Sequence, residues 1–276
     1  MGILDYNLMN EIAEKCRALK PDFMIYGEGW NMPSFVPEHL RASMLNQAHM
    51  PLIGHFSDRF RETCRGSNGD LEICGYSNGD TGLLNSMQQC LGGGCLDHLF
   101  DSPQKAINYV ECHDNHTLWD KNSVCCQHES RGVLMQRQTL ANALVILAQG
   151  IPFLHAGQEF GRTKYNLGNS YNRSDHYNHI DYNLRNKHMP IVVDTKLLIK
   201  IRKEHPCFVW LQKKRSKPML ALVISMEKYW SIRQSVKRMS ASVSLIRLRN
   251  ILHTIRIKSC RFYLIMEISM RPRLIG

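Results

Sequence analysis

Four short apolar runs lie in the first 208 residues, and polar or aromatic side chains follow each run directly. The runs fall at 23–26, within 53–60, at 107–112 and at 151–155. Each run is short enough for a strand and has the composition of a strand buried on both faces. Helical patterns separate several of the runs, which indicates βα units and a parallel sheet. The sequence therefore predicts an α/β fold.

Three stretches carry apolar residues at helical spacing. We expect helices over residues 9–19, over 132–148 with Gly150 as the cap, and over 195–204. Residues 31–104 are rich in Gly, Asn, Ser and His, so we expect them to be irregular apart from one strand.

Chemistry-bearing side chains at the carboxyl ends of parallel strands are typical of a (β/α)8 barrel, the TIM barrel. A full barrel needs eight βα units and about 250 residues. The chain before residue 209 supplies four such units, so we expect a partial TIM barrel. Half a barrel leaves the backbone groups of two edge strands unpaired.

The chain changes character near Phe208. Residues 1–208 carry 20 Lys and Arg against 22 Asp and Glu, whereas residues 209–276 carry 15 against 2. The second stretch has no Asp and no Gly before Gly276, so it lacks the residues that form turns. We interpret 1–208 as one domain and 209–276 as an irregular basic tail that is out of frame or was never selected to fold. A nucleic-acid or membrane-surface arm is the alternative, but we expect neither partner.

The ten cysteines include no C-x-x-C pair, so the sequence favours neither a zinc site nor a disulfide framework. We expect reduced thiols and a cytoplasmic rather than a secreted protein. No apolar run reaches 18 residues, and the first residues do not have the pattern of a secretory signal.

Glu28 follows the first apolar run and stands between Gly27 and Gly29, with Trp30 next. Glycines let the backbone approach a ligand closely, and the indole of Trp30 offers an apolar face to a sugar ring. A carboxylic acid in such a place protonates a glycosidic oxygen if burial raises its pKa. An ordinary loop glutamate is the alternative interpretation.

His113 and Asp114 follow the third apolar run. An aspartate beside a histidine binds sugar hydroxyls and stabilises an oxocarbenium-like transition state, although a turn or a helix cap uses the same residues. A metal site made of His113, Asp114 and His116 is a further alternative, but no other ligand stands at metal-binding spacing. We therefore expect no metal and no other cofactor, and the sequence leaves a calcium site open.

Five segments carry a further pattern, namely 26–30, 55–67, 109–121, 150–160 and 169–182. Their order and spacing resemble the alpha-amylase superfamily of glycoside hydrolases, in the form found in type I pullulanases. The segment with His113 and Asp114 is similar to the fourth signature region, with Cys112 where a serine is usual, and the segment with Glu28 is similar to the third. The resemblance implies that the four βα units are the last four of the barrel.

The resemblance also implies roles for individual residues. Glu28 matches the general acid/base of the family, Asp114 matches its transition-state stabiliser, and His113 matches a residue that bonds sugar hydroxyls. Further candidates for lining the substrate cleft are Trp30, Asn115, Tyr171, Asn172 and Asp175.

The nucleophilic aspartate of the family has no counterpart in this sequence. In the family it stands in the pattern Phe-Arg-Phe-Asp-Leu, on the strand before the helix expected at residues 9–19. Its position therefore falls just upstream of Met1, and Asp5 is no substitute because it stands at the entry to that helix. A retaining glycosidase needs two carboxyl groups about 5–5.5 Å apart, so we expect this chain alone to have negligible hydrolase activity.

For the parental protein these features predict hydrolysis of α-1,6-glucosidic bonds in pullulan, limit dextrins or amylopectin by a retaining mechanism. An α-1,4-acting amylase or an amylopullulanase is the alternative within the same class, since bond preference rests on resemblance at the level of the group. A non-catalytic glucan-binding remnant is the alternative from another class. In each case the expected partner is an α-glucan polysaccharide or oligosaccharide.

Overall fold

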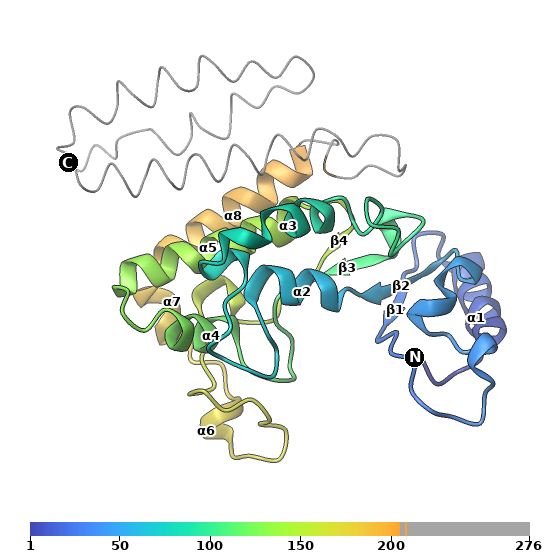
Figure 1. Cartoon of the computed structure of the whole chain (residues 1–276), viewed down its shortest axis with the longest axis horizontal. Helices are drawn as coiled ribbons and strands as arrows, with labels where there is room; N and C mark the ends of the chain where they lie inside the picture. Colours follow the sequence, from blue (N-terminus) through green and yellow to red (C-terminus); the bar gives the residue numbers. More distant parts are fainter. Residues whose placement is uncertain (205–207, 209–276) are drawn as a thin grey trace. The chain divides into compact units, whose positions relative to one another are not determined.

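The computed structural model describes residues 1–204 and residue 208. These residues contain a four-stranded parallel sheet in the order β1-β2-β3-β4 (Figure 1). The strands are β1 Ile25–Gly27, β2 Ile53–Phe56, β3 Ala106–Asn108 and β4 Ile151–Pro152. The α/β fold with a parallel sheet is confirmed. The predicted tail, 209–276, and its boundary with the predicted domain lie outside the described residues.

All four strands are shorter than the apolar runs that predict them. The third run, 107–112, keeps strand pairing only as far as Asn108, which lies opposite Pro152 of β4. Beyond that point the carbonyl of Val110 accepts a hydrogen bond from Arg65 Nη1 at 3.0 Å. The chain therefore leaves the sheet early, and the residues that follow form a loop.

Helices make up most of the connections between strands. The α-helices are α1 Tyr6–Leu19, α2 Asp58–Arg65, α3 Leu84–Leu91, α4 Leu118–Cys125, α5 Arg131–Leu147, α6 Asp175–Asn178, α7 Asn183–Lys187 and α8 Met189–Glu204. The 3-10 helices are η1 Glu38–Leu40, η2 Met44–His49, η3 Tyr76–Asn78, η4 Thr81–Leu83, η5 Pro103–Lys105 and η6 Gln158–Phe160. The connection from β1 to β2 contains only 3-10 helices, whereas the next two connections each contain two α-helices.

The predicted first helix is confirmed as α1. Asp5 caps its N-terminus, because Oδ1 accepts a hydrogen bond from Asn7 N at 2.7 Å. The buried apolar residues of α1 belong to a cluster made of Met9, Ala13, Ala42, Met50 and Ile53. Apolar burial therefore packs α1 against the start of β2 and against Ile25 of β1.

The prediction that residues 31–104 are irregular apart from one strand is wrong, because α2 and α3 also lie there. In α2 two arginines, Arg61 and Arg65, are buried together with Phe60 and Cys64. A helix with so many charged residues shows little apolar periodicity in the sequence. Contacts with distant segments bury it, and local sequence reasoning does not detect such contacts.

The long helices α5 and α8 pack against each other (Figure 1). The predicted cap of α5 is wrong: Ala148 is the C-cap, and Gly150 lies in the turn into β4 with φ of 100°. The last predicted helix is longer than expected, since α8 begins at Met189 and Pro190 fits its first turn. Among residues 1–204, no helix has the length and apolar character needed to span a membrane.

Candidate active site

The carboxyl ends of β1, β2 and β3 meet around the carboxylate of Asp58, the first residue of α2. Trp30 Nε1, from the segment after β1, donates a hydrogen bond to Asp58 Oδ2 at 2.5 Å. The hydroxyl of Tyr109, which follows β3, donates to Asp58 Oδ1. Arg61 Nη1 lies 3.1 Å from the same Oδ1 and 2.5 Å from the Tyr109 hydroxyl. Burial, helped by the hydrogen bond to Asp58, raises the pKa of Tyr109 and keeps this phenol a donor.

Four aromatic rings form a row across the sheet, one from each strand or the residue beyond it. Phe56 stands in the middle, with ring centroids at 5.6 Å from Tyr26, 5.0 Å from Tyr109 and 5.2 Å from Phe153, all edge to face. Tyr26 is 41% exposed and Trp30 is 45% exposed. An accessible aromatic surface beside polar groups is suited to contact with the apolar face of a sugar ring.

Glu28 directly follows β1, and its side chain is exposed. Its backbone is held on both sides, since Gly2 N donates to Glu28 O at 3.1 Å and Met44 N donates to Gly29 O at 2.7 Å. A Cβ on Gly29 would lie 2.5 Å from His55 Nδ1. The missing side chain of this glycine therefore leaves room for the buried ring of His55 and not for a ligand. The described residues fix the backbone of Glu28 but do not supply the burial that a general acid uses.

His113 and Asp114 lie on the loop after β3. His113 Nε2 is 3.4 Å from Asp114 Oδ1, and the two side chains are 85% and 50% exposed. Asn115 follows with φ of 60°, a left-handed conformation that asparagine adopts more readily than most residues. Thr117 then caps α4, because its hydroxyl accepts a hydrogen bond from Asp120 N at 3.1 Å.

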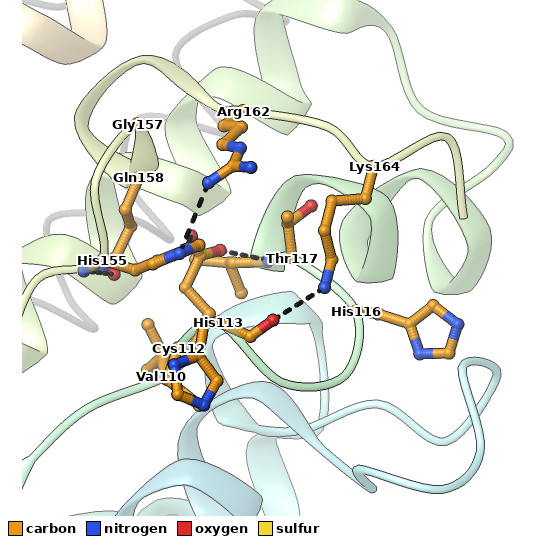
Figure 2. A network of polar contacts seen from close by, with 12 residues as sticks. Val110, Cys112, His113, His116, Thr117, His155, Gly157, Gln158, Arg162 and Lys164 are labelled. Carbon is orange, nitrogen blue, oxygen red and sulfur yellow. Dashed lines mark hydrogen bonds and ion pairs between the residues drawn. The ribbon is translucent and has the colours of Figure 1, made fainter. Parts of the chain in front are cut away.

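Two buried cations hold the backbone of this loop. Lys164 Nζ donates to His113 O at 3.0 Å (Figure 2). Arg65 Nη1 donates to His116 O at 2.8 Å. Each side chain is 1% exposed, and burial lowers the pKa of both. Backbone carbonyls take the place of the water that these cations lose. The exposed side chains of His113 and Asp114 therefore stand on a fixed backbone.

Glu111 lies at the start of the same loop and is 1% exposed. Its Oε2 accepts a hydrogen bond from the backbone N–H of Leu118, the first residue of α4, where a negative charge is favourable. Its Oε1 lies 3.0 Å from Nδ1 of His155, which follows β4. On the other side of that ring, Arg162 Nη1 lies 3.5 Å from Nε2 (Figure 2). Glu111 therefore connects the end of β3 to α4 and to the segment after β4.

This network reaches the loop that carries the three remaining predicted cleft residues, Tyr171, Asn172 and Asp175. Arg162 Nη2 donates to Asn178 O at 2.6 Å. Asn178 Nδ2 in turn donates to Ser170 O at 2.7 Å and to Arg173 O at 3.0 Å, which closes the loop around α6. All three predicted side chains are exposed.

The predicted site residues stand at one edge of the sheet in separate groups. Glu28 and Trp30 follow β1, while His113, Asp114 and Asn115 follow β3, and β2 lies between the two strands. Two strand spacings correspond to roughly 10 Å. The hydrogen bonds of Asp58 to Trp30 and Tyr109 join the two groups.

Sequence reasoning missed Asp58, Glu111 and His155. Their partners lie 28 to 51 residues away along the chain, so no local pattern indicates these contacts. One signal was available, since each of the three is a polar residue in the second half of one of the apolar runs, close to the strand end, as Glu28 is close to the end of β1.

Within residues 1–204 and 208, no group of three or more His, Cys, Asp or Glu side chains is arranged to hold a metal ion. His113, Asp114 and His116, the alternative metal site, are therefore not arranged to hold a metal ion either. The polar atoms at the strand ends are instead engaged with one another and with backbone groups.

Comparison with known proteins gives pullulanases among the relatives, although no family model matches the chain. The chain is 38% identical over 212 residues to pullulanase from Bacillus subtilis (strain 168), a match that covers 75% of this chain and 30% of the relative. It is 30% identical over 176 residues to pullulanase A from Streptococcus pneumoniae (strain D39), covering 59% of this chain and 14% of that protein.

Solved structures agree with the sequence relatives. Pullulanase from Anoxybacillus sp. LM18-11, in complex with maltotriose, has a TM-score of 0.76 at 41% identity and covers 79% of this chain and 31% of its own. Pullulanase type I from Bacillus subtilis, in complex with maltose, has a TM-score of 0.75 at 36% identity, with 79% and 31% covered.

Fold and relatives together are those of the alpha-amylase superfamily, whose pullulanases are glycoside hydrolases. Within that class the chain belongs to the type I pullulanases, as its sequence motifs predict. It spans about 30% of the length of the Bacillus subtilis relative.

Proposed function

We propose that this chain is part of an enzyme that hydrolyses α-1,6-glucosidic bonds in pullulan, limit dextrins or amylopectin with retention of configuration. One observation carries the proposal. Glu28 and Asp114 follow β1 and β3 at the same edge of a parallel sheet, in a chain 38% identical to a pullulanase. No contact in the described residues favours α-1,4 bonds over α-1,6 bonds.

In the proposed reaction Glu28 protonates the leaving glycosidic oxygen and then activates the water that releases the product. Asp114 stabilises the positive charge of the oxocarbenium-like transition state, and His113 bonds sugar hydroxyls. The exposed side chains of His113 and Asp114 are accessible to a sugar, and the backbones of Glu28 and His113 are held by hydrogen bonds. Relatives from Anoxybacillus solved with maltotriose and with maltotetraose support an α-glucan as the ligand.

We also propose that the sheet corresponds to the last four strands of a (β/α)8 barrel. The four strands are all parallel and neighbour one another in sequence order, which is the arrangement of consecutive barrel strands. The candidate catalytic residues stand at their carboxyl ends, where active sites of such barrels lie. In this proposal β1 and β4 pair with further strands to close the barrel.

The chain alone is proposed to have negligible hydrolase activity. A retaining mechanism needs a second carboxylate about 5–5.5 Å from the acid/base, free to attack the sugar. Among the described residues, Asp58 and Glu111 are carboxylates that lie shortly after β2 and β3. The first accepts hydrogen bonds from Trp30 and Tyr109, and the second from the backbone of α4 while it faces His155. Both are engaged in structural contacts, so neither is left as a nucleophile.

Two measurements on the purified chain test these statements together. Maltotriose titrated against tryptophan fluorescence reports binding, and reducing ends released from pullulan report turnover. We expect binding without turnover, with Trp30→Ala weakening binding about tenfold and Phe35→Ala, which removes another exposed aromatic ring, leaving it unchanged. Release of maltotriose from pullulan by the folded chain would contradict the proposed inactivity, and an absence of glucan binding would contradict the proposed site.

A further inference from the structure

Three cysteine thiols gather where the segment after α2 meets the end of α4. Cys125 Sγ and Cys126 Sγ are 3.6 Å apart. Cys74 Sγ lies 3.8 Å from the backbone carbonyl oxygen of Cys125, and the Cys74 thiol is close enough to influence the pKa of both neighbouring thiols. We call Cys74, Cys125 and Cys126 the thiol cluster. It is separate from the strand-end residues that carry the proposed hydrolase function.

A buried lysine brings the two segments together. Lys121 is 0% exposed, and its Nζ reaches from α4 into the loop at 67–73. It donates hydrogen bonds to three backbone carbonyls of that loop, at 3.1 Å to Ser67, 2.5 Å to Asp70 and 2.7 Å to Ile73. An antiparallel bridge between Gly66 and Cys74 closes the same loop. Cys74 is therefore presented to the end of α4 by a specific structure and not by a chance approach.

The three thiols differ in acidity and in access to solvent. The thiol of Cys125 donates a hydrogen bond to Cys126, which lowers the pKa of Cys126 and raises the pKa of Cys125. The positive charge of Arg137 lowers the pKa of Cys126 further. Cys126 is 7% exposed, whereas Cys74 is only partly buried. The better nucleophile, Cys126, is therefore inside the thiol cluster, whereas Cys74 and Cys125 are both partly accessible to an oxidant.

We propose that the thiol cluster is a site of reversible oxidation, at which a peroxide joins Cys74 and Cys126 in a disulfide. In the first step the Cys74 thiol attacks one oxygen of hydrogen peroxide. The O–O bond breaks, and Cys74 becomes a sulfenic acid while water is released. In the second step the Cys126 thiolate attacks the Cys74 sulfur, the S–O bond breaks, and hydroxide leaves. A dithiol reductant reverses the oxidation by thiol exchange.

Cys74 is the favoured partner because the two adjacent cysteines cannot easily bridge to each other. A bridge between Cys125 and Cys126 closes a strained small ring through their shared peptide bond, whereas Cys74 comes from a segment 51 residues away. The disulfide fastens the loop at 66–74 to α4, in addition to the contacts of Lys121. A cross-link over so long a segment raises the thermal unfolding midpoint by roughly 10 °C.

Peptide mapping of the full chain tests the proposal. The reduced chain is treated with hydrogen peroxide, its remaining thiols are alkylated, and it is digested with trypsin without reduction. Trypsin leaves Cys74 on the peptide 66–105 and the other two thiols of the cluster on the peptide 122–131. We expect these two peptides to be cross-linked, with fragmentation placing the bond at Cys74. Dithiothreitol is expected to release the cross-link and to lower the unfolding midpoint again.

Variants separate the thiol cluster from general thiol oxidation. Cys74→Ser is expected to abolish the cross-link, and Cys126→Ser to leave only a bond between Cys74 and Cys125, which forms at least tenfold more slowly. Cys16→Ser, which removes a partly buried thiol on α1, is expected to change neither the yield nor the rate. The same treatment in urea is expected to give mixed disulfides. A native-state mixture of disulfides, or oxidation without a Cys74 cross-link, would overturn the proposal.

Discussion

Glu111 and His155 face each other between the ends of β3 and β4, with 3.0 Å from Oε1 to Nδ1. The other carboxylate oxygen accepts the first backbone N–H of α4, and Glu111 is 1% exposed. The pair therefore forms the buried support of the loop whose tip carries His113 and Asp114. The proposed function depends on this support, because both side chains at the tip are exposed and gain their position only from the backbone.

Replacing Glu111 with alanine leaves the Leu118 N–H and the His155 ring without their buried partner. We expect Glu111→Ala to lower the free energy of unfolding by about 3 kcal/mol. Glu111→Gln is expected to lose roughly half as much, because its amide oxygen still accepts from Leu118. Urea unfolding at pH 7 measures both. Glu14→Gln, on the exposed side of α1, is the control. If Glu14→Gln and Glu111→Ala had the same urea midpoint, Glu111 would not support the loop after β3.

Lys164 supports the same loop from another side, since its Nζ donates to His113 O and to Gly168 O. Lys164→Met keeps the length of the side chain but leaves both carbonyls without this donor. We expect backbone amides of residues 112–116 to exchange with deuterium at least tenfold faster in this variant. Lys196→Met removes an exposed ammonium and is expected to leave exchange unchanged. Unaltered exchange in Lys164→Met would show that the lysine does not hold the loop.

Gly29 connects Glu28 to Trp30 and has no room for a methyl group. In Gly29→Ala the added Cβ lies 2.5 Å from His55 Nδ1 and 3.1 Å from Met44 N. We expect this variant to lose about 2 kcal/mol of stability or more, because a small-to-large change in a packed place forces a shift. Gly69→Ala is the matched control, since nothing lies within 4 Å of its added Cβ. Thermal unfolding of the two variants should differ clearly, and coincident curves would refute the close packing.

His55 should make stability depend on pH. It is 0% exposed and, within the described residues, its ring nitrogens have no partner, so burial lowers its pKa from 6.5 to about 4. The positive charges of Lys105 and the N-terminus lower the pKa further. Between these two values the unfolded chain binds a proton that the folded chain does not. The contribution of neutral His55 to the free energy of unfolding is therefore complete above pH 6.5. It decreases by about 3 kcal/mol as the pH falls toward 4.

His55→Phe tests this pH dependence, because phenylalanine keeps a ring next to Phe100, which stacks on His55 at 6.2 Å. We expect the variant to be more stable than the parent at pH 4.5 and closer to it at pH 7. The difference between the two urea midpoints, measured at both pH values, removes the effect of carboxylates that titrate in the same range. A difference that does not change with pH would contradict a neutral, buried His55.

Local sequence patterns were sufficient for the sheet and for α1, α5 and α8. Each strand is an apolar run, and each of these helices has apolar periodicity. They were not sufficient for α2, in which long-range polar contacts bury Arg61 and Arg65. The length of β3 was also overestimated, since the Val110 carbonyl leaves the sheet to bond Arg65.

The candidate site divides in the same way. Glu28, His113 and Asp114 could be predicted as site residues because each follows a strand and stands in a recognisable motif. Glu111 was passed over within the same motif, although it makes the buried contacts to His155 and α4. A spacing rule finds exposed residues near strand ends, whereas the identity of a buried partner is decided only when distant segments come together.

The central claim is that Glu28 is the acid/base of a pullulanase site. Its most direct test is a chimera in which residues 1–204 replace the matching part of the Bacillus subtilis pullulanase, assayed by the sugar released from pullulan. We predict an active chimera, about a thousandfold loss of kcat in its Glu28→Gln variant with maltotriose binding retained, and no change in its Glu14→Gln variant. Pullulan hydrolysis by the Glu28→Gln chimera at the rate of the parent chimera would contradict the claim.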